Sequence, residues 1–190
     1  MGCTESNVKS TATEYLKKQM KDPSSFKVEK IEVLLDTVPL FLNKNLMSLS
    51  EKFSEAVDEN NRYKDRDNYL WRKEKEKASQ NLFESMVAFN LEYKLQKDKE
   101  QPYQYMVMIS CSANNSYGSI VSSKYIIIVD KEDTDKVLGE YRIDSDFVKK
   151  IVASYFITGE KELKENEFGK IETDGMTTIE KFIFDESILS

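Results

Sequence analysis

Histidine is absent from the 190 residues of this chain. Histidine is the commonest general base in enzymes and the commonest metal ligand, so its absence argues against most catalytic and zinc-binding arrangements. The only two cysteines, Cys3 and Cys111, cannot form a CxxC site and do not suggest a disulfide scaffold. We therefore expect no cofactor, no bound metal and no enzymatic activity.

Proline, glycine and long apolar runs are also scarce. Three prolines and six glycines are too few for a flexible linker protein or for low-complexity disorder. No run of 18 or more apolar residues occurs, so no segment is expected to span a membrane. Hydrophobic residues make up 39% of the chain and aromatic residues 11%, which is enough for the core of a single domain over residues 1–190.

The charge balance argues against nucleic acid as a partner. The formal net charge is −6 and the isoelectric point is about 5.0, whereas nucleic-acid binding requires clustered cations that displace phosphate counterions. The most basic stretch, Arg72 to Lys77, alternates in sign. Such alternation is typical of a solvated helix face with internal ion pairs.

The chain opens with Met1-Gly2-Cys3, and Gly-Cys is how a bacterial lipobox ends. In this interpretation Cys3 carries the lipid, residues 1–6 form an anchor-proximal tail, and Met1 replaces a removed signal segment. The expected location is then the bacterial cell envelope, on its periplasmic or surface face. Two alternatives stay open: myristoylation of Gly2 with palmitoylation of Cys3, or an ordinary N-terminus.

Apolar residues at helical spacing predict three helical regions. These cover residues 8–20, an insertion over residues 44–85, and residues 147–155. Ser6 or Asn7 can cap the first helix, and Asp22-Pro23 ends it, because the residue before a proline disfavours the α conformation. The insertion is either one long helix or a hairpin that turns near Asn60-Asn61. Asp144 begins the cap of the last helix.

Apolar residues that alternate with polar ones, or that form short runs bounded by turns, predict the strands. These cover residues 26–38, 87–95, 103–111, 120–130, 137–143 and 177–184. The alternation of the first strand slips by one residue, which predicts a bulge near Glu29–Lys30. The four strands between residues 87 and 143 are expected to form an antiparallel meander. The sequence thus predicts an α+β fold with a cystatin-like or NTF2-like outline, and residues 159–190 as a C-terminal extension.

Two features contain residue types that can react or bind metal, and we interpret both as structural. Cys111 is in phase with Val107 and Ile109, so it should face the core and be inert. The acidic turn over residues 130–135 lacks the glycine and the final glutamate of a calcium-binding loop. We therefore expect a buried thiol and a solvated hairpin turn.

Two surfaces are candidates for binding an unknown protein or polar ligand. The first is Tyr69 with Trp71, the only tryptophan, in the most charged helix of the chain. Tryptophan and tyrosine are enriched at interface hot spots, whereas the simpler interpretation is that Trp71 packs across a helical hairpin. The second is the loop of Asn114, Asn115 and Tyr117, whose composition also fits a tight turn.

Two short motifs carry a resemblance to a known group of proteins. They are Lys21-Asp22-Pro23-Ser24-Ser25-Phe26 and Asn115-Ser116-Tyr117-Gly118. With them the chain resembles small bacterial lipoproteins of unknown function, especially those of Bacteroides-type bacteria, in which Asn114 is usually a lysine. This resemblance implies export and anchoring, and it implies no activity.

Three functional hypotheses follow from these observations. The first is an envelope-anchored lipoprotein that serves as a binding or protein-interaction module, attached to the membrane through its lipid alone. The second is a hydrolase or isomerase that uses carboxylates in a sheet-lined pocket. The third is an architectural or assembly subunit that contacts other subunits through the helical hairpin. Converging carboxylates in a deep pocket would favour the second hypothesis.

Overall fold

A computed structural model describes residues 2–64, 66, 69–164 and 171–185, except for the side chain of Cys3. The chain forms two compact units. The sheet unit consists of residues 1–38, 101–147 and 173–190, and the hairpin unit consists of residues 39–100 and 148–172. Each unit is built from segments that are distant in the sequence.

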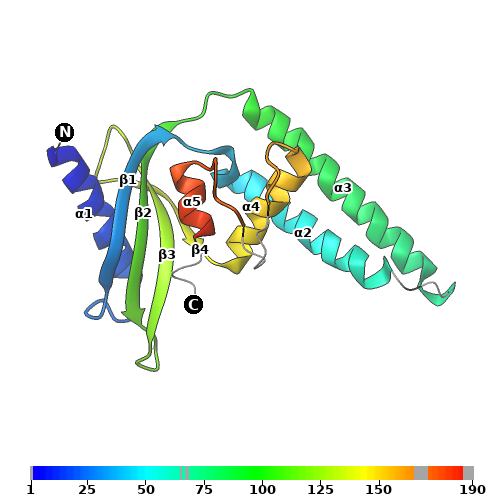
Figure 1. Ribbon diagram of the computed structural model, residues 1–190, viewed down its shortest axis with the longest axis horizontal. Coiled ribbons are helices and arrows are strands. Elements are labelled where there is room, and N and C mark those ends of the chain that lie inside the picture. The colour runs from blue at the N-terminus through cyan, green and yellow to red at the C-terminus, as the bar shows by residue number, and fades with distance from the viewer. Residues whose placement is uncertain (1, 65, 67–68, 165–170, 186–190) are drawn as a thin grey trace. The chain divides into compact units, whose positions relative to one another are not determined.

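The sheet unit contains a four-stranded antiparallel meander in the order β1-β2-β3-β4 (Figure 1). The strands are β1 (Lys27–Thr37), β2 (Tyr103–Asn114), β3 (Ile120–Val129) and β4 (Val137–Ile143). The expected α+β fold with a meander sheet is confirmed. The register of β1 on β2 shifts between Val28 and Lys30, which confirms the predicted bulge.

Helix α1 (Gly2–Gln19) covers one face of this sheet. Val8, Ala12 and Leu16 are completely buried and belong to the same cluster as the odd-numbered residues of β2 and β3. Those strand residues are Val107, Ile109, Cys111, Tyr125, Ile127 and Val129. Burying one apolar stripe of the helix on one face of the sheet is the contribution that holds α1 in place.

The predicted cap of α1 is wrong, because the helix begins at Gly2 and includes Ser6 and Asn7. The side chain of Asn7 instead donates hydrogen bonds to Oγ1 of Thr134, at 2.6 Å, and to Oδ1 of Asp135, at 3.2 Å. These acceptors lie in the turn between β3 and β4. Asn7 therefore joins α1 to the sheet, a tertiary role that local capping preferences do not reveal.

Helix α5 (Thr178–Phe184) lies on the opposite side of the sheet from α1 (Figure 1). The strand predicted over residues 177–184 is therefore wrong. Thr177 and Glu180 form a capping box, in which each side chain accepts a hydrogen bond from the other residue's backbone. The Thr-x-x-Glu spacing was present in the sequence, but Ile179, Phe182, Ile183 and Phe184 leave no polar face, which obscured the helical period.

Helix α4 (Ser145–Thr158) begins in the sheet unit and continues in the hairpin unit. Oδ1 of Asp144 accepts a hydrogen bond of 2.9 Å from the backbone N–H of Phe147, so the predicted cap is confirmed. In the hairpin unit, the ring of Tyr155 makes an edge contact with that of Phe41 at 6.1 Å. Lys150 forms an ion pair with Glu51 of α2 at 3.2 Å.

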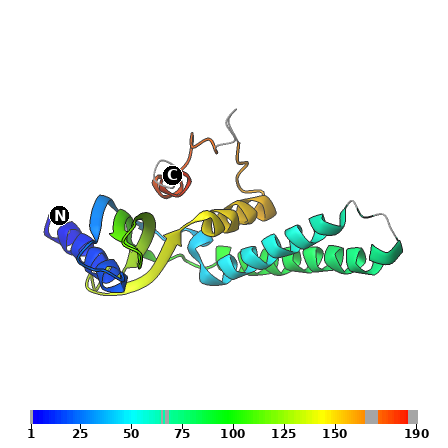
Figure 2. The ribbon, with the colours of Figure 1, turned by 90° about the horizontal axis from the view of Figure 1, so that it is seen from below.

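The hairpin unit contains two helices that run side by side in opposite directions, α2 (Lys44–Lys64) and α3 (Arg72–Lys97) (Figure 2). A single 3-10 turn over Tyr69–Trp71 precedes α3, and another over Leu40–Leu42 precedes α2. The insertion is thus a hairpin rather than one helix. Helix α2 continues through Asn60 and Asn61 to Lys64, so the position predicted for the turn is wrong.

The strand predicted over residues 87–95 is also wrong, because these residues lie in α3. Phe89 and Tyr93 are buried in a cluster with Leu46 of α2, whereas Val87, Leu91 and Leu95 are exposed. The helix carries two apolar rows on different faces, and each row has a spacing of four residues. Because the two rows are offset by two positions, the sequence alternates with a period of two, as a strand does. The edge of the sheet expected for residues 87–95 is occupied by β1 instead.

Candidate functional site

The most prominent exposed feature of the hairpin unit is a row of apolar side chains along α3. We call this row the α3 ridge. Its members are Phe83, Val87, Leu91 and Leu95, which expose 62%, 38%, 61% and 61% of their surface. Residues four apart lie about 40° apart around an α-helix, so the four side chains form one continuous row about 18 Å long.

The ridge is unusual because the same helix also buries an apolar face. Ala78 and Phe89 are completely buried and Tyr93 is nearly so, which provides the contact with α2. A surface helix of a monomeric protein normally carries polar residues opposite its buried stripe. Here the second face exposes on the order of 400 Å² of apolar surface in one row, which is in the size range of the largest, often functional, apolar patch of a monomeric protein.

Sequence reasoning missed the ridge because it assigned Val87, Leu91 and Leu95 to a strand. The spacing of four from Phe83 to Leu95 fits a helix and a strand alike, so it did not reveal the ridge by itself. A second set with helical spacing, Ala78, Leu82, Phe89 and Tyr93, runs through the same residues. Two interleaved helical sets predict a helix with apolar residues on two faces.

The structure places Tyr69 and Trp71 at the end of the hairpin where α3 begins. Tyr69 is 85% exposed and Trp71 is 38% exposed. The indole of Trp71 lies against the ring of Tyr63, with centroids 6.0 Å apart, and the guanidinium of Arg66 lies 4.7 Å from its centroid. Trp71 therefore has packing partners of its own, while Tyr69 presents most of its ring to solvent.

The loop between β2 and β3 is a tight turn with one exposed aromatic ring. Oδ1 of Asn115 accepts hydrogen bonds from the backbone N–H groups of Tyr117 and Ser119, at 2.9 and 3.0 Å. Gly118 has a φ of 78°, which a glycine adopts without strain. Asn115 is thus engaged in the turn, whereas Tyr117 is 91% exposed.

This loop lies beside the turn that follows α1, so the two motifs of the resemblance come together in space. Oγ of Ser25 accepts a hydrogen bond of 2.8 Å from the backbone N–H of Asn114 and donates one of 2.9 Å to the carbonyl of Asp22. Hydrogen bonding, above all from the Ser24 hydroxyl, lowers the pKa of the Asp22 carboxyl, and the Asn114 side chain contributes. Asn114 therefore has a structural role at this junction.

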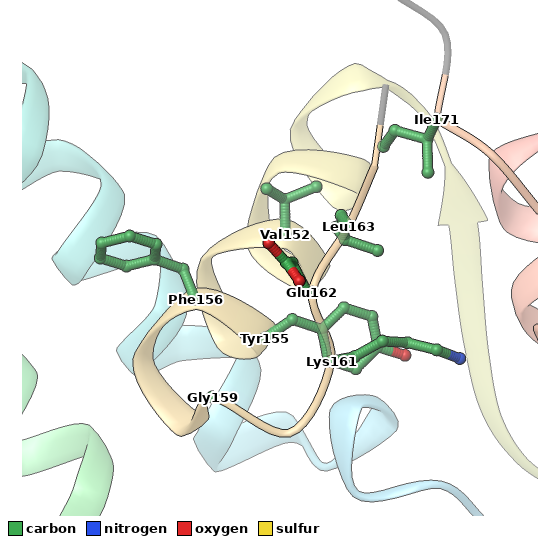
Figure 3. Close-up of a pocket in the computed structure, with 8 residues that line it drawn as sticks. All are labelled: Val152, Tyr155, Phe156, Gly159, Lys161, Glu162, Leu163 and Ile171. Atoms are coloured by element: carbon green, nitrogen blue, oxygen red, sulfur yellow. The ribbon is translucent and has the colours of Figure 1, made fainter. Parts of the chain in front are cut away.

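A cavity of about 450 Å³ lies beside α4 and the segment that follows it (Figure 3). Its apolar lining includes Val152, Leu163 and Ile171, and the side chains of Lys161 and Glu162 point in different directions. Among the described residues that line it, Glu162 is the single carboxylate. The described part of the lining thus does not supply the converging carboxylates that would favour the hydrolase hypothesis.

Three glutamates, Glu55, Glu59 and Glu84, line a shallow groove between α2 and α3. Glu55 and Glu84 are exposed, and Glu59 accepts a hydrogen bond of 3.3 Å from the side chain of Asn81. Within the described part of the chain, no group of three or more Asp, Glu, Cys or His residues has the geometry of a metal site. The groove is best described as a solvated, acidic helix surface.

A serine and a lysine lie opposite each other in the interior of the sheet unit. Ser110 of β2 is paired with Lys124 of β3, and both are completely buried. Burial lowers the pKa of the Lys124 ammonium, partly offset by the charge of Asp185. The Lys124 ammonium donates to the carbonyl of Phe182 at 2.8 Å and to that of Asp185.

A lysine beside a serine is a pair of residue types used by some hydrolases. Here Lys124 binds the last carbonyls of α5, where a cation also interacts favourably with the helix dipole. The Ser110 hydroxyl has no hydrogen-bond partner among the described residues. The arrangement favours a structural function for Lys124, which fixes α5 to the sheet.

Cys111 is buried, and this desolvation raises the pKa of its thiol to about 11, so its expected inward position is confirmed. The side chain of Cys3 lies outside the described residues. No helix of the described chain is both long and apolar enough to cross a lipid bilayer.

Comparison with family models, with curated proteins and with solved structures finds no match for this chain. We therefore infer its function from its own residues. Of the surfaces described above, the α3 ridge is the largest exposed apolar row, and it lies on a helix whose other face is already packed. It is the best candidate for a functional site.

Proposed function

We propose that this protein is a protein-interaction module, and that its hairpin binds an α-helix of its partner along the α3 ridge. The single observation that carries this proposal is the exposure of Phe83, Val87, Leu91 and Leu95 in one row. Rows of side chains spaced by four residues are the ridges that pack into the grooves of a second helix. A helical partner therefore fits this surface better than a strand or a small polar ligand.

The residues beside the ridge support a helical partner. Ala88 is exposed and small, so a second helix can approach the α3 backbone next to Val87 and Leu91. Glu84 and Lys94 are exposed on the same helix and provide a polar rim. An apolar centre with a polar rim is the general anatomy of protein interfaces.

Site-specific photo-crosslinking in the cells that naturally express the protein tests this function. A photoreactive amino acid at Leu91 should give a covalent product with a second polypeptide, joined through a helical segment that mass spectrometry identifies. The matched control places the same amino acid at Ile120, which is also exposed and apolar but lies in β3. If Leu91 gives no product, or the same products as Ile120, the proposed function is wrong.

We further propose that the module is held at the envelope by a lipid on Cys3. This proposal is supported by Gly2-Cys3 in the sequence and by the resemblance to small bacterial lipoproteins. When the gene is expressed with its native upstream sequence, the protein should enter the membrane fraction, and Cys3→Ser should release it. A soluble wild-type protein would contradict anchoring and would leave the interaction proposal untouched.

A further inference from the structure

We propose that β4 is a dimerisation strand. The β4 strands of two copies of this chain pair antiparallel about Tyr141 and join two four-stranded sheets into one continuous sheet. This inference goes beyond the proposed function, since it concerns the sheet unit and not the α3 ridge. It rests on the edge of the sheet, on the two charges of β4 and on the absence of an ion-pair partner for one of them.

The outer side of β4 offers backbone groups to another strand. In the described chain β4 pairs with β3 alone, at one end of the order β1-β2-β3-β4. Every second residue of such a strand directs its N–H and C=O away from the sheet. Over Gly139–Ile143 the pairing with β3 has no register shift, so this stretch is a regular edge. An added strand is the ligand that satisfies a row of such groups.

The two charges of β4 lie on the same face of the sheet. Glu140 is paired with Ile127 of β3, and Arg142 with Tyr125. Opposed residues project to the same face, and both β3 residues belong to the core cluster under α1. Burial is the main cause of the raised pKa of Tyr125, and the charges of Arg142 and Glu140 also act on it. Both charges therefore project to the face that α1 covers.

Antiparallel pairing about Tyr141 brings these charges together across the interface. It places Glu140 opposite Arg142 of the second copy and Arg142 opposite Glu140, so the pair occurs twice. The register matches residues whose numbers are both even or both odd, so the backbone groups that point outward on one strand meet those of the other. The two Tyr141 rings are neighbours on the opposite face, and aromatic cross-strand pairs stabilise a sheet.

The state of the charges distinguishes this edge from the other one. In β1, Lys30 and Glu32 are also two residues apart, but they form an ion pair with each other at 2.8 Å. The bulge beside Lys30 further protects that edge. Arg142, in contrast, is exposed and has no ion pair within the described residues. The second copy supplies the carboxylate that Arg142 lacks in the monomer.

The length of the paired stretch limits the affinity. Two stretches of five residues bury less surface than a standard protein interface of about 1,600 Å². We therefore expect a weak, reversible dimer with a dissociation constant of roughly 10 µM to 1 mM.

Disulfide trapping in a Cys3→Ser background tests the register. Cys111 is buried, so it does not compete. Opposed residues of paired strands have Cα atoms about 4.5–5.5 Å apart, within the range of a disulfide. A mixture of Glu140→Cys and Arg142→Cys proteins should therefore form a covalent dimer under mild oxidation. Each variant alone is the control and should form much less, because residue 140 does not face residue 140. Equal yields would overturn the register.

Analytical ultracentrifugation up to about 1 mM protein tests the charge pairs. The sedimenting mass should rise from 22.1 kDa towards twice that value. Arg142→Glu and Glu140→Arg should each weaken the dimer roughly tenfold, because each replaces two attractive pairs by two repulsive ones. Glu140→Arg/Arg142→Glu should recover wild-type affinity. Single variants with wild-type affinity, or a double variant without recovery, would overturn the pairing.

The matched control for charge reversal is Glu32→Lys in β1, the other edge of the sheet, which should dimerise like the wild type. Leu91→Asp, which disrupts the α3 ridge, should also leave the dimer intact. A protein that stays monomeric at about 1 mM, or an association that Leu91→Asp abolishes, overturns the pairing of β4. Crosslinking from Leu91 in cells does not depend on this dimer, so the proposed function can fail or stand independently.

Discussion

The backbone N–H of Asn114 donates a hydrogen bond of 2.8 Å to Oγ of Ser25. These two residues are 89 positions apart in the sequence, and each belongs to one of the two motifs on which the resemblance to bacterial lipoproteins rests. The hydrogen bond joins the turn after α1 to the end of β2. The two motifs thus form one structural junction.

Replacing Ser25 by alanine should destabilise this junction. The variant removes the acceptor of the Asn114 N–H and the donor to the Asp22 carbonyl, so we expect a loss of about 0.5–1.5 kcal/mol per hydrogen bond in the free energy of unfolding. Urea denaturation measures the loss. Ser116→Ala, an exposed position in the same loop, is the control and should change stability by less than about 0.5 kcal/mol. Equal effects of the two variants would show that the junction contributes nothing.

Lys124 provides a second test, because its stem and its ammonium make separate contributions. Lys124→Ala should cost about 2–5 kcal/mol, since it leaves a cavity under α5 and removes the donor to the Phe182 carbonyl. Lys124→Met should cost clearly less, because it retains the volume of the stem and removes an ammonium that had to be desolvated. Thermal denaturation compares the two. A methionine variant as unstable as the alanine variant would show that the ammonium, not the stem, dominates.

Because the Cys111 thiol is buried, we expect the free energy of unfolding to depend on pH in the alkaline range. Burial raises its pKa from 9.0 to about 11, so the unfolded chain loses the thiol proton at a lower pH than the folded protein. Between these values the unfolded state binds fewer protons, and stability falls as the pH rises. Cys111→Ala lacks this contribution. The difference in unfolding free energy between wild type and variant should therefore be constant below pH 9.0 and shrink towards about pH 11.

Both proteins in this comparison should carry Cys3→Ser, so that Cys111 is the only thiol. A difference that stays constant across the whole range would contradict the raised pKa. Rapid reaction of Cys111 with a thiol reagent in the native protein would contradict its burial directly, because a buried thiol should react only when denaturant is added.

Trp71 should contribute to stability through its contact with Tyr63. The two rings lie 6.0 Å apart between centroids, and pairs of this kind contribute about 0.5–1.5 kcal/mol beyond the area that they bury. A double-mutant cycle with Trp71→Ala and Tyr63→Ala should therefore give a coupling energy in this range. Tyr69→Ala, at a position 85% exposed, should change stability by less than about 0.5 kcal/mol.

A coupling energy near zero would mean that the Trp71 indole does not pack on Tyr63 in solution. In that case Trp71→Ala should leave folding nearly unchanged, and the original hypothesis that Trp71 is a partner-binding anchor would gain support. Photo-crosslinking from position 71, compared with position 91, would then decide which part of the hairpin contacts the partner.

Local patterns in the sequence were sufficient for most of the sheet unit. The alternation in residues 103–111 and the apolar residues of 120–130 and 137–143 predicted β2, β3 and β4. Consecutive residues of β2 and of β3 are buried, so both faces of these two strands are covered over much of their length. The slip near Glu29–Lys30 predicted the bulge in β1, and Asp144 predicted the cap of α4. These features depend on neighbouring residues along the chain, so the sequence alone determined them.

Tertiary structure decided the features that depend on partners distant in the sequence. Residues 87–95 alternate like a strand, yet Phe89 and Tyr93 are buried in the cluster with Leu46 of α2 while Leu91 and Leu95 face solvent. No local pattern distinguishes a buried row from an exposed row of the same composition. The position of Asn114 beside Ser25 and that of Lys124 beside α5 are likewise products of packing. The fold class could therefore be predicted from the sequence. The α3 ridge could not, because α2 covers the other face of α3 and only that packing determines which apolar row remains exposed.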